Sequence, residues 1–396
     1  MQLSQRGRAV PPSPIRKLVP YADAAKAKGV HVYHLNIGQP DIPTSPVFWE
    51  AIRRFPDKVL AYGHSAGFLE YRQQLAAGYR ALGYGDVGPD DVTVTTGGSE
   101  AIQFALMAVC DPGDEALCFE PFYTNYNGYA VEAAVTLVPI ACRAEEGYHL
   151  PPQSAIAAKI TPRTRALLAC TPNNPTGTVL GREEMESLAR LARDHDLFFI
   201  SDETYRDFIY EGRHTSVMHL GLGERAVLID SISKRFSACG ARIGCLVTTN
   251  RDLSRAFLHF GQARLCPPSL EQVGALALLG LPPDYFRGVL AEYRQRRDLV
   301  VDELGRMPGV LCKRPEGAFY AMARVPVDDA NRFAQWLLTD WRCHESTVMV
   351  APGDGFYATP GLGQDEVRIA YVLEVEKLRH AMVCLGEGLK AYPGRT

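Results

Sequence analysis

The chain has 396 residues, 46% of them hydrophobic and 22% charged, which is enough material for a sizeable buried core. Its formal net charge of -3 offers no overall attraction for nucleic acid or for an anionic membrane surface, so we expect neither as a partner. No apolar run approaches the roughly 18 residues that a membrane span requires, and no leader peptide pattern opens the chain. We therefore expect a globular, cytoplasmic protein.

The ten cysteines occur singly, without the CxxC spacing of metal or redox sites. They are also too dilute for a disulfide framework. We expect mostly buried thiols in a reducing compartment, and no metal centre.

The expected elements begin with an extended arm, because Pro11, Pro12, Pro14 and Pro20 interrupt any long helix. From about residue 92, short apolar runs alternate with amphipathic stretches, which predicts an α/β fold with a buried, mostly parallel sheet. The expected strands are 92–95, 116–119, 166–170, 197–200, 226–229 and 244–248, and the expected helices between them are 100–109 and 183–194.

A long charged stretch at 285–304 predicts a helix that leads into a second unit, with strands around 317–325 and 366–372. We expect three parts. An N-terminal arm, 1–45, joins the small domain; a large domain covers 46–280; and the small C-terminal domain covers 281–396.

Polar residues follow the expected strands of the large domain. Asn173 to Gly177 follow the strand at 166–170, and Asp202 ends the next one. Open α/β sheets bind their ligands at the carboxyl ends of strands, which favours a site here. Taken singly, the first motif could be a plain strand-to-helix turn, and Asp202 could be only a helix N-cap.

Lys234 follows the strand at 226–229 and lies between Ser231, Ser233 and, further along, Arg242. Hydroxyls, a guanidinium and backbone N–H groups hold phosphate dianions, and an activated lysine amine forms imines. A second anion-binding pattern, Gly97-Gly98-Ser99, lies directly before the expected helix at 100–109. Together these motifs predict a reactive lysine beside a phosphate group.

The ordered set resembles the class I aminotransferases, which are fold type I enzymes dependent on pyridoxal phosphate. The matching motifs run from Asn36–Pro40 through the residues named above to Arg368. The resemblance implies a large domain with a mostly parallel seven-stranded sheet, a smaller α+β domain, and a homodimer with shared active sites. It also implies that the cofactor is pyridoxal 5'-phosphate.

By this resemblance, Lys234 carries the cofactor as a Schiff base and acts as the general base, and Asp202 pairs with the pyridinium nitrogen. Tyr205 and Asn174 hydrogen-bond the ring hydroxyl. Tyr123 stacks on the ring, or Phe122 if the register differs by one residue. The residues implied for the phosphate are Gly98, Ser99, Ser231, Ser233, Arg242 and, from the neighbouring subunit, Tyr62.

The same resemblance makes Arg368 the arginine that grips the substrate α-carboxylate, with Asn174 beside it and Gly38 closing over the substrate. We expect a ping-pong transaminase that moves the amino group of an L-amino acid, aspartate favoured, to a 2-oxo acid such as 2-oxoglutarate. Arg264 is a candidate for a distal carboxylate, although Cys266 departs from the asparagine that the family usually carries there.

Other functions stay open on the sequence. An aromatic or bulky substrate could be bound by side chains for which core packing is the alternative: Tyr33, Phe122, Tyr126, Phe356 and Tyr357. The same cofactor also serves lyases, synthases and oxidases. A ligand-sensing regulator of this fold is disfavoured, because the resemblance begins by about residue 30 and leaves no room for a DNA-binding module.

Overall fold

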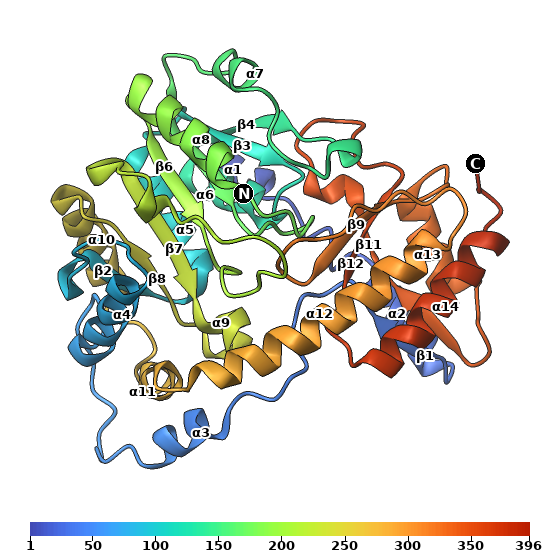
Figure 1. Ribbon diagram of the computed structural model, residues 1–396, viewed down its shortest axis with the longest axis horizontal. Helices are drawn as coiled ribbons and strands as arrows, with labels where there is room; N and C mark the ends of the chain where they lie inside the picture. The colour runs from blue at the N-terminus through green and yellow to red at the C-terminus, as the bar shows by residue number, and fades with distance from the viewer.

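The computed structural model describes residues 1–396, and its centre is a seven-stranded sheet with helices on both faces (Figure 1). The strand order is β2-β8-β7-β6-β5-β3-β4. Only β8 runs antiparallel to its neighbours, so the mostly parallel sheet is confirmed. The strands are β2 (Val92–Thr95), β3 (Glu115–Glu120), β4 (Thr136–Ala141), β5 (Thr164–Cys170), β6 (Phe198–Asp202), β7 (Ala226–Ser231) and β8 (Gly244–Val247).

Both faces of this sheet are buried because successive side chains of a strand point to opposite sides. In β5, Ala166 and Leu168 belong to the apolar cluster that includes α5, whereas Leu167 and Ala169 belong to the cluster that includes α8. The helices of this part are α3 (Pro46–Arg53), α4 (Leu69–Ala81), α5 (Gly97–Val109), α6 (Asn125–Ala133), α7 (Gln153–Ala157), α8 (Arg182–Asp194), α9 (Ile232–Arg235), α10 (Arg251–Arg264) and α11 (Ser269–Leu279).

The second part combines both ends of the chain. The strand β1 (His31–His34) pairs in parallel with β10 (Ser346–Met349), and β9 (Tyr320–Arg324), β11 (Ala351–Pro352) and β12 (Glu366–Ala370) form an antiparallel sheet. Its helices are α2 (Val19–Ala27), α12 (Pro283–Gly305), α13 (Ala330–Thr339) and α14 (Val375–Ala391). The boundaries at 45 and 280 stay predictions. None of the helices is long and apolar enough to cross a membrane.

Two expectations are wrong in detail. The arm is not extended throughout, because α2 begins at Val19 and accommodates Pro20 in its first turn, where the missing N–H is not needed. The strand β4 was not predicted at all. It lies at the edge of the sheet, is largely half-exposed and contains Pro139, so it lacks the apolar run of a buried strand.

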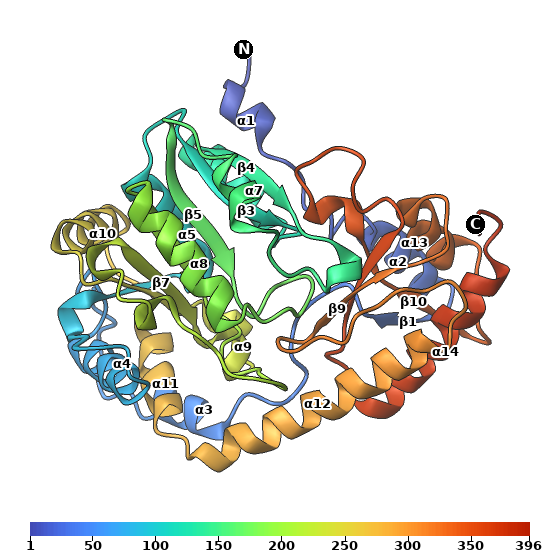
Figure 2. The same cartoon turned by 45° about the horizontal axis from the view of Figure 1, so that its top comes forward.

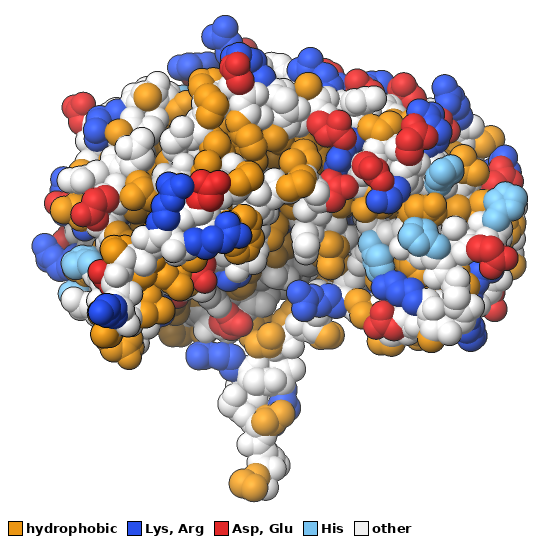
Figure 3. Space-filling view, turned by 90° about the horizontal axis from the view of Figure 1, so that it is seen from below, with side chains coloured by type: hydrophobic (Ala, Val, Ile, Leu, Met, Phe, Trp, Pro, Cys, Tyr) orange, Lys and Arg blue, Asp and Glu red, His pale blue; other side chains and the backbone are white.

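The first residues project from the body. Residues 1–12 are all exposed, although Gln5–Ala9 form the short helix α1. Figure 2 shows α1 extending away from the sheet, and Figure 3 shows this segment as a narrow projection. Little of the chain itself packs against it.

His149 links the two parts of the molecule. Its Nδ1 lies 3.0 Å from Glu184 in α8, and its Nε2 lies 3.6 Å from Glu316, which precedes β9. The interactions of the ring with these carboxylates raise the pKa of His149 to about 10 and lower the pKa of both glutamates. A charged imidazolium therefore bridges two carboxylates across neutral pH.

The His149→Gln variant should unfold more easily, and the difference should depend on pH. Because the folded pKa is raised, the stabilisation is fully present below the ordinary value of 6.5 and is lost as pH rises through about 10. We expect a loss of about 1 kcal/mol near pH 6, modest because the pair is partly exposed. Thermal unfolding of both proteins from pH 6 to pH 10.5 measures it, and a pH-independent difference would contradict the bridge.

Candidate active site

A cavity of about 280 Å³ lies at the carboxyl ends of β5, β6 and β7, where their last residues Cys170, Asp202 and Ser231 reach its wall. The structure brings together here nearly every residue that the sequence put forward. The wall includes Gly38, Gly98, Ser99, Tyr123, Asn174, Asp202, Tyr205, Ser231, Ser233, Lys234, Arg242 and Arg368.

Lys234 lies on α9, a single helical turn that follows β7 directly. Its Nζ donates to the carbonyl oxygen of Gly38 at 2.8 Å and lies 3.7 Å from Cys239 Sγ. The amine is not tied to a carboxylate. It is therefore available for reaction inside the cavity.

Gly38 brings the N-terminal arm against this lysine and leaves no room for a side chain. A Cβ at residue 38 would lie 1.8 Å from Tyr320 Oη, a distance that atoms cannot adopt. Tyr320 Oη in turn is 2.9 Å from Tyr205 Oη, so the tyrosine cannot yield without breaking that hydrogen bond. Close approach of the arm explains the glycine.

The Gly38→Ala variant should therefore displace Tyr320 and disturb the cavity. We expect overpacking to cost about 1–3 kcal/mol of stability and catalysis to fall about 10-fold or more, because small displacements at a reacting centre are costly. Gly240→Ala is the matched control, since a Cβ at residue 240 meets nothing within 4 Å. Steady-state rates and thermal unfolding test this, and equal effects of the two variants would contradict it.

Asp202 is a buried carboxylate at the end of β6. Its Oδ2 accepts a hydrogen bond from Tyr126 at 2.7 Å, and its Oδ1 accepts one from Thr204 Oγ1 at 2.7 Å. Burial raises the pKa of Asp202, and the hydrogen bonds oppose that rise only in part. No cationic side chain is paired with it, so it would gain from a positively charged N–H in the cavity.

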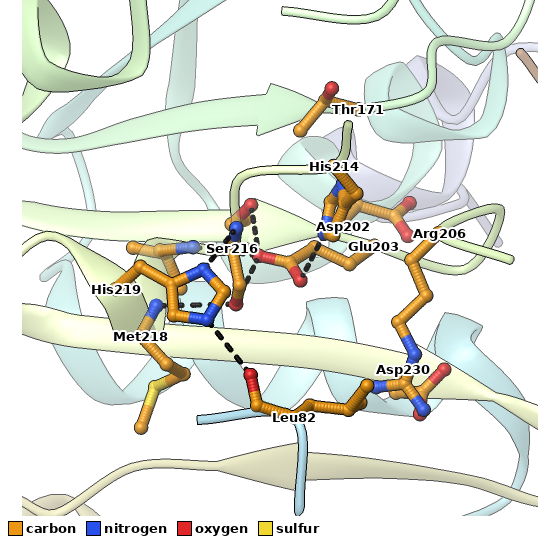
Figure 4. A network of polar contacts seen from close by, with 12 residues as sticks. Leu82, Thr171, Asp202, Glu203, Arg206, His214, Ser216, Met218, His219 and Asp230 are labelled. Carbon is orange, nitrogen blue, oxygen red and sulfur yellow. Dashed lines mark hydrogen bonds and ion pairs between the residues drawn. The ribbon is translucent and has the colours of Figure 1, made fainter. Parts of the chain in front are cut away.

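The next residue, Glu203, turns away from the cavity and organises the loop behind it. Figure 4 shows its carboxylate among Ser216, His214 and the backbone of this loop. It accepts hydrogen bonds from Ser216 Oγ at 3.0 Å and Val217 N at 2.9 Å, and His214 Nε2 lies 2.7 Å away. These bonds hold the end of β6, and therefore Asp202, in place.

A cradle for an anion is built where β7, β8 and α5 meet. Arg242, in a left-handed conformation with φ of 54°, lies so close to Gly97 that a Cβ there would be 2.5 Å from its Nη2. Ser231 Oγ donates to Ser233 Oγ at 2.9 Å, which places two hydroxyls side by side. The first N–H groups of α5, which begins at Gly97, have no partners within the helix.

Arg368 also lines the cavity and is 1% exposed. One guanidinium nitrogen donates to Asn174 Oδ1 at 2.8 Å and another to Asn36 O at 2.5 Å, whereas its Nε has no partner. Its guanidinium packs over the rings of Tyr320 and Phe356, 4.6 and 4.8 Å from their centroids. Burial disfavours the charged guanidinium and so lowers the pKa of Arg368. An anion bound beside the guanidinium would stabilise its charged form.

The structure separates the two aromatic candidates for the cofactor ring. Tyr123 lines the cavity, and its hydroxyl oxygen accepts a hydrogen bond from Asn125 at 2.8 Å. Phe122 is 1% exposed, does not line this cavity and packs against Tyr126 in the core. The other bulky candidates, Tyr33, Tyr126, Phe356 and Tyr357, also lie outside the wall.

Two further candidates lie away from the cavity of their own chain. Tyr62 is 80% exposed, so its ring packs against little of its own chain. Arg264 donates to Ser65 O at 3.1 Å and lies 3.5 Å from Glu100, which neutralises it. The guanidinium that we considered for a distal carboxylate is therefore engaged by other residues of the same chain.

The sequence did not predict the supporting roles of several residues in and around the wall. Tyr126 and Thr204 orient Asp202, Tyr320 orients Tyr205, and Asn36 orients Arg368. Thr204 and Asn36 stand inside the motifs already noted, which was a usable signal. Tyr126 and Tyr320 carry no local signal, because only the fold brings them to the site.

Known proteins share this arrangement. The sequence signature described as Aminotransferase class I and II matches residues 30–385. The chain belongs to this aminotransferase family.

The relatives agree over nearly the whole chain. An aspartate aminotransferase of Thermotoga maritima is 32% identical over 382 residues, covering 96% of this chain and 97% of its own. An aspartate/prephenate aminotransferase of Thermus thermophilus is 33% identical over 386 residues, with the same coverages of 96% and 97%. The solved structure of the Thermus thermophilus aspartate aminotransferase with maleate superposes with a TM-score of 0.90 at 31% identity, covering 98% of this chain and 100% of that one.

This aminotransferase uses pyridoxal phosphate, as its family does. Its residues fit that group at each end. The cradle of Ser231, Ser233 and Arg242 suits a phosphate dianion, and the buried carboxylate of Asp202 suits a protonated ring nitrogen. Lys234 lies in the same cavity and presents an amine that can bond an aldehyde carbon.

Proposed function

We propose that this aminotransferase moves the amino group of an L-amino acid, with aspartate favoured, to a 2-oxo acid such as 2-oxoglutarate by a ping-pong mechanism. The observation that carries the proposal is the cavity that holds a lysine amine without a carboxylate partner, an anion cradle with Arg242, and the buried Arg368. Both sequence relatives described above have aspartate in their names, which supports the choice of substrate.

The proposed holders of the cofactor are the residues of the cavity wall. Gly98, Ser99, Ser231, Ser233 and Arg242 would bind the phosphate, Asp202 the ring nitrogen, and Asn174 and Tyr205 the ring hydroxyl. Tyr123 would stack on the ring. When bound, pyridoxal phosphate supplies an aldehyde that condenses with amines and a ring that withdraws electrons from the substrate Cα.

Lys234 has two tasks in this proposal. With the cofactor bound, Lys234 would hold it covalently until the substrate amine takes its place, and its freed Nζ would accept the proton that leaves the substrate Cα. Its hydrogen bond to Gly38 O, at 2.8 Å, points the free amine into the cavity wall beside the arm. Asp202, held by Tyr126 and Thr204, would keep the ring nitrogen protonated and so favour the withdrawal of electrons from the substrate Cα.

Arg368 is the proposed binder of the substrate α-carboxylate. Its fork is oriented by Asn174 and Asn36, and its Nε is unpaired. A carboxylate bound here would accept charge-assisted hydrogen bonds from the guanidinium and neutralise its buried charge. The arm at Gly38 then covers the substrate and keeps water from the reacting centre.

We also propose a homodimer in which each site is completed by the other subunit. Tyr62 is 80% exposed and follows Val59 and Leu60, which are 73% and 59% exposed, so this segment presents apolar side chains to solvent in a single chain. The projecting residues 1–12 would gain a packing partner in such a dimer. The ten free cysteines agree with a proposed cytoplasmic location.

A panel of amino donors and oxo acids tests the proposal. With the cofactor bound, each L-amino acid is added alone, and conversion of the cofactor to its amine form is followed by loss of absorbance. We expect aspartate to react fastest and 2-oxoglutarate to restore the absorbance. Conversion by aromatic donors alone would redirect the substrate, and ammonia or peroxide release without the amine form would replace transamination by lyase or oxidase chemistry.

A further inference from the structure

One charged side chain of the cavity wall has no task in the proposed function. The charged residues in the wall are Arg16, Asp202, Lys234, Arg242 and Arg368. The last four serve the cofactor and the substrate α-carboxylate. Arg16 comes from the N-terminal arm and is unassigned.

The backbone around Arg16 is connected to the substrate end of the cavity. Asn36 Nδ2 donates to the carbonyl oxygen of Ile15 at 3.4 Å, and Asn36 O accepts from Arg368 at 2.5 Å. Two hydrogen bonds therefore link the residue before Arg16 to the guanidinium of Arg368. The arm at Arg16 is therefore anchored, through Asn36, to the arginine proposed for the substrate α-carboxylate.

Neighbouring contacts fix this turn of the arm. Pro14 packs so tightly on Gly355 that a Cβ on that glycine would lie 2.3 Å from the proline Cβ, and Lys17 Nζ lies 3.6 Å from Asp354. Arg16 N donates to Ser13 O at 3.1 Å. The backbone is thus held, which lowers the entropy cost of using the side chain to bind a ligand.

The side chain of Arg16 itself is free. It makes no ion pair and no hydrogen bond, whereas Lys17 beside it and Arg264 are both paired. Asp202 is the one acidic residue in the wall, and in the proposed function it pairs with the ring nitrogen of the cofactor. A substrate whose side chain ends in a carboxylate would therefore meet a positive partner, and one that ends in a cation would be repelled.

We infer that Arg16 is a specificity-determining residue that binds the distal carboxylate of a dicarboxylic substrate. This inference rests on the proposed function. It places the second substrate cation on the arm of the same subunit, in place of Arg264. Because Arg16 is exposed, its contribution is that of one partly solvated, charge-assisted contact.

The test compares Arg16→Gln, Arg16→Lys and the control Arg6→Gln, which removes an exposed arm arginine outside the wall. The rate constant of the first half-reaction per unit donor is measured for aspartate and for alanine, which share the α-carboxylate. We expect Arg16→Gln to lower the value for aspartate about 10- to 100-fold and to leave alanine within about 2-fold. The loss should appear in KM, and Arg16→Lys should recover part of it.

Binding of succinate to the cofactor-loaded enzyme, measured by calorimetry, gives a readout that does not need turnover. Its dissociation constant should rise with Arg16→Gln and stay unchanged with Arg6→Gln. Equal losses for aspartate and alanine, or no loss for either, would overturn the role of Arg16 while transamination stands. A wild-type enzyme that reacts faster with alanine than with aspartate would also overturn the role of Arg16. Absence of transamination with every donor would instead overturn the proposed function itself.

Discussion

The Lys234→Ala variant should lose turnover by at least about 10⁴-fold, because it removes both the covalent tether and the base that moves the Cα proton. The protein should still fold, since the hydrogen bonds of Lys234 Nζ run only to Gly38 O and Cys239 Sγ. Cofactor bound to the variant should be removable by dialysis. The absorbance band of the lysine-bound cofactor should be absent.

Lys159→Ala is the control, because Lys159 is an exposed lysine outside the cavity wall. Activity, absorbance and thermal unfolding are measured on all three proteins. Turnover together with the absorbance band in Lys234→Ala would mean that another amine does the chemistry. Adding a small primary amine should restore part of the lost rate, because it can replace the base without replacing the tether.

The Asp202→Asn variant should separate activity from stability. Its neutral amide cannot hold the proton on the ring nitrogen, so we expect the rate to fall about 10²- to 10³-fold, the usual cost of one preorganised electrostatic group. Without cofactor, burial raises the pKa of Asp202 above its ordinary value. The ionised carboxylate therefore destabilises the folded protein at a pH above the raised pKa. This destabilisation is absent at a pH below the ordinary pKa of an aspartate.

Removing that charge should leave the cofactor-free protein as stable as before, or stabilise it by about 1 kcal/mol at neutral pH. The neighbour Glu203 gives the opposite pattern. Glu203→Gln leaves buried donors such as Ser216 Oγ and Val217 N imperfectly paired, which should cost about 1–3 kcal/mol. The free energies of unfolding of the two cofactor-free variants are compared at pH 7. A large loss of stability in Asp202→Asn would contradict the cost that we assign to burying the ionised Asp202 carboxylate.

Strands that are buried on both faces were predictable, and the exposed edge was not. The runs at 92–95 and 166–170 are continuous apolar or β-branched stretches because helices cover both sides of the sheet. The edge strand Thr136–Ala141 is covered less completely and tolerates Pro139. Its formation depends on pairing with β3, which local sequence does not report.

Residues that follow strands in the sequence were predictable members of the site. Asp202 and Ser231 end neighbouring parallel strands, so their positions on one edge follow from the α/β pattern alone. Arg16 and Tyr320 come from the arm and from β9, far from these strands in the sequence. No local pattern connects them with Lys234.

The sequence by itself determined the α/β sheet, the reactive lysine and the order of the motifs around it, because burial and turn chemistry act between residues close in the chain. The tertiary structure decided which side chains complete the wall. It placed Tyr123 rather than Phe122 in the cavity, bound Arg264 to Ser65 and Glu100, and left Arg16 unpaired in the cavity wall. These outcomes depend on packing between distant segments, where one contact excludes another.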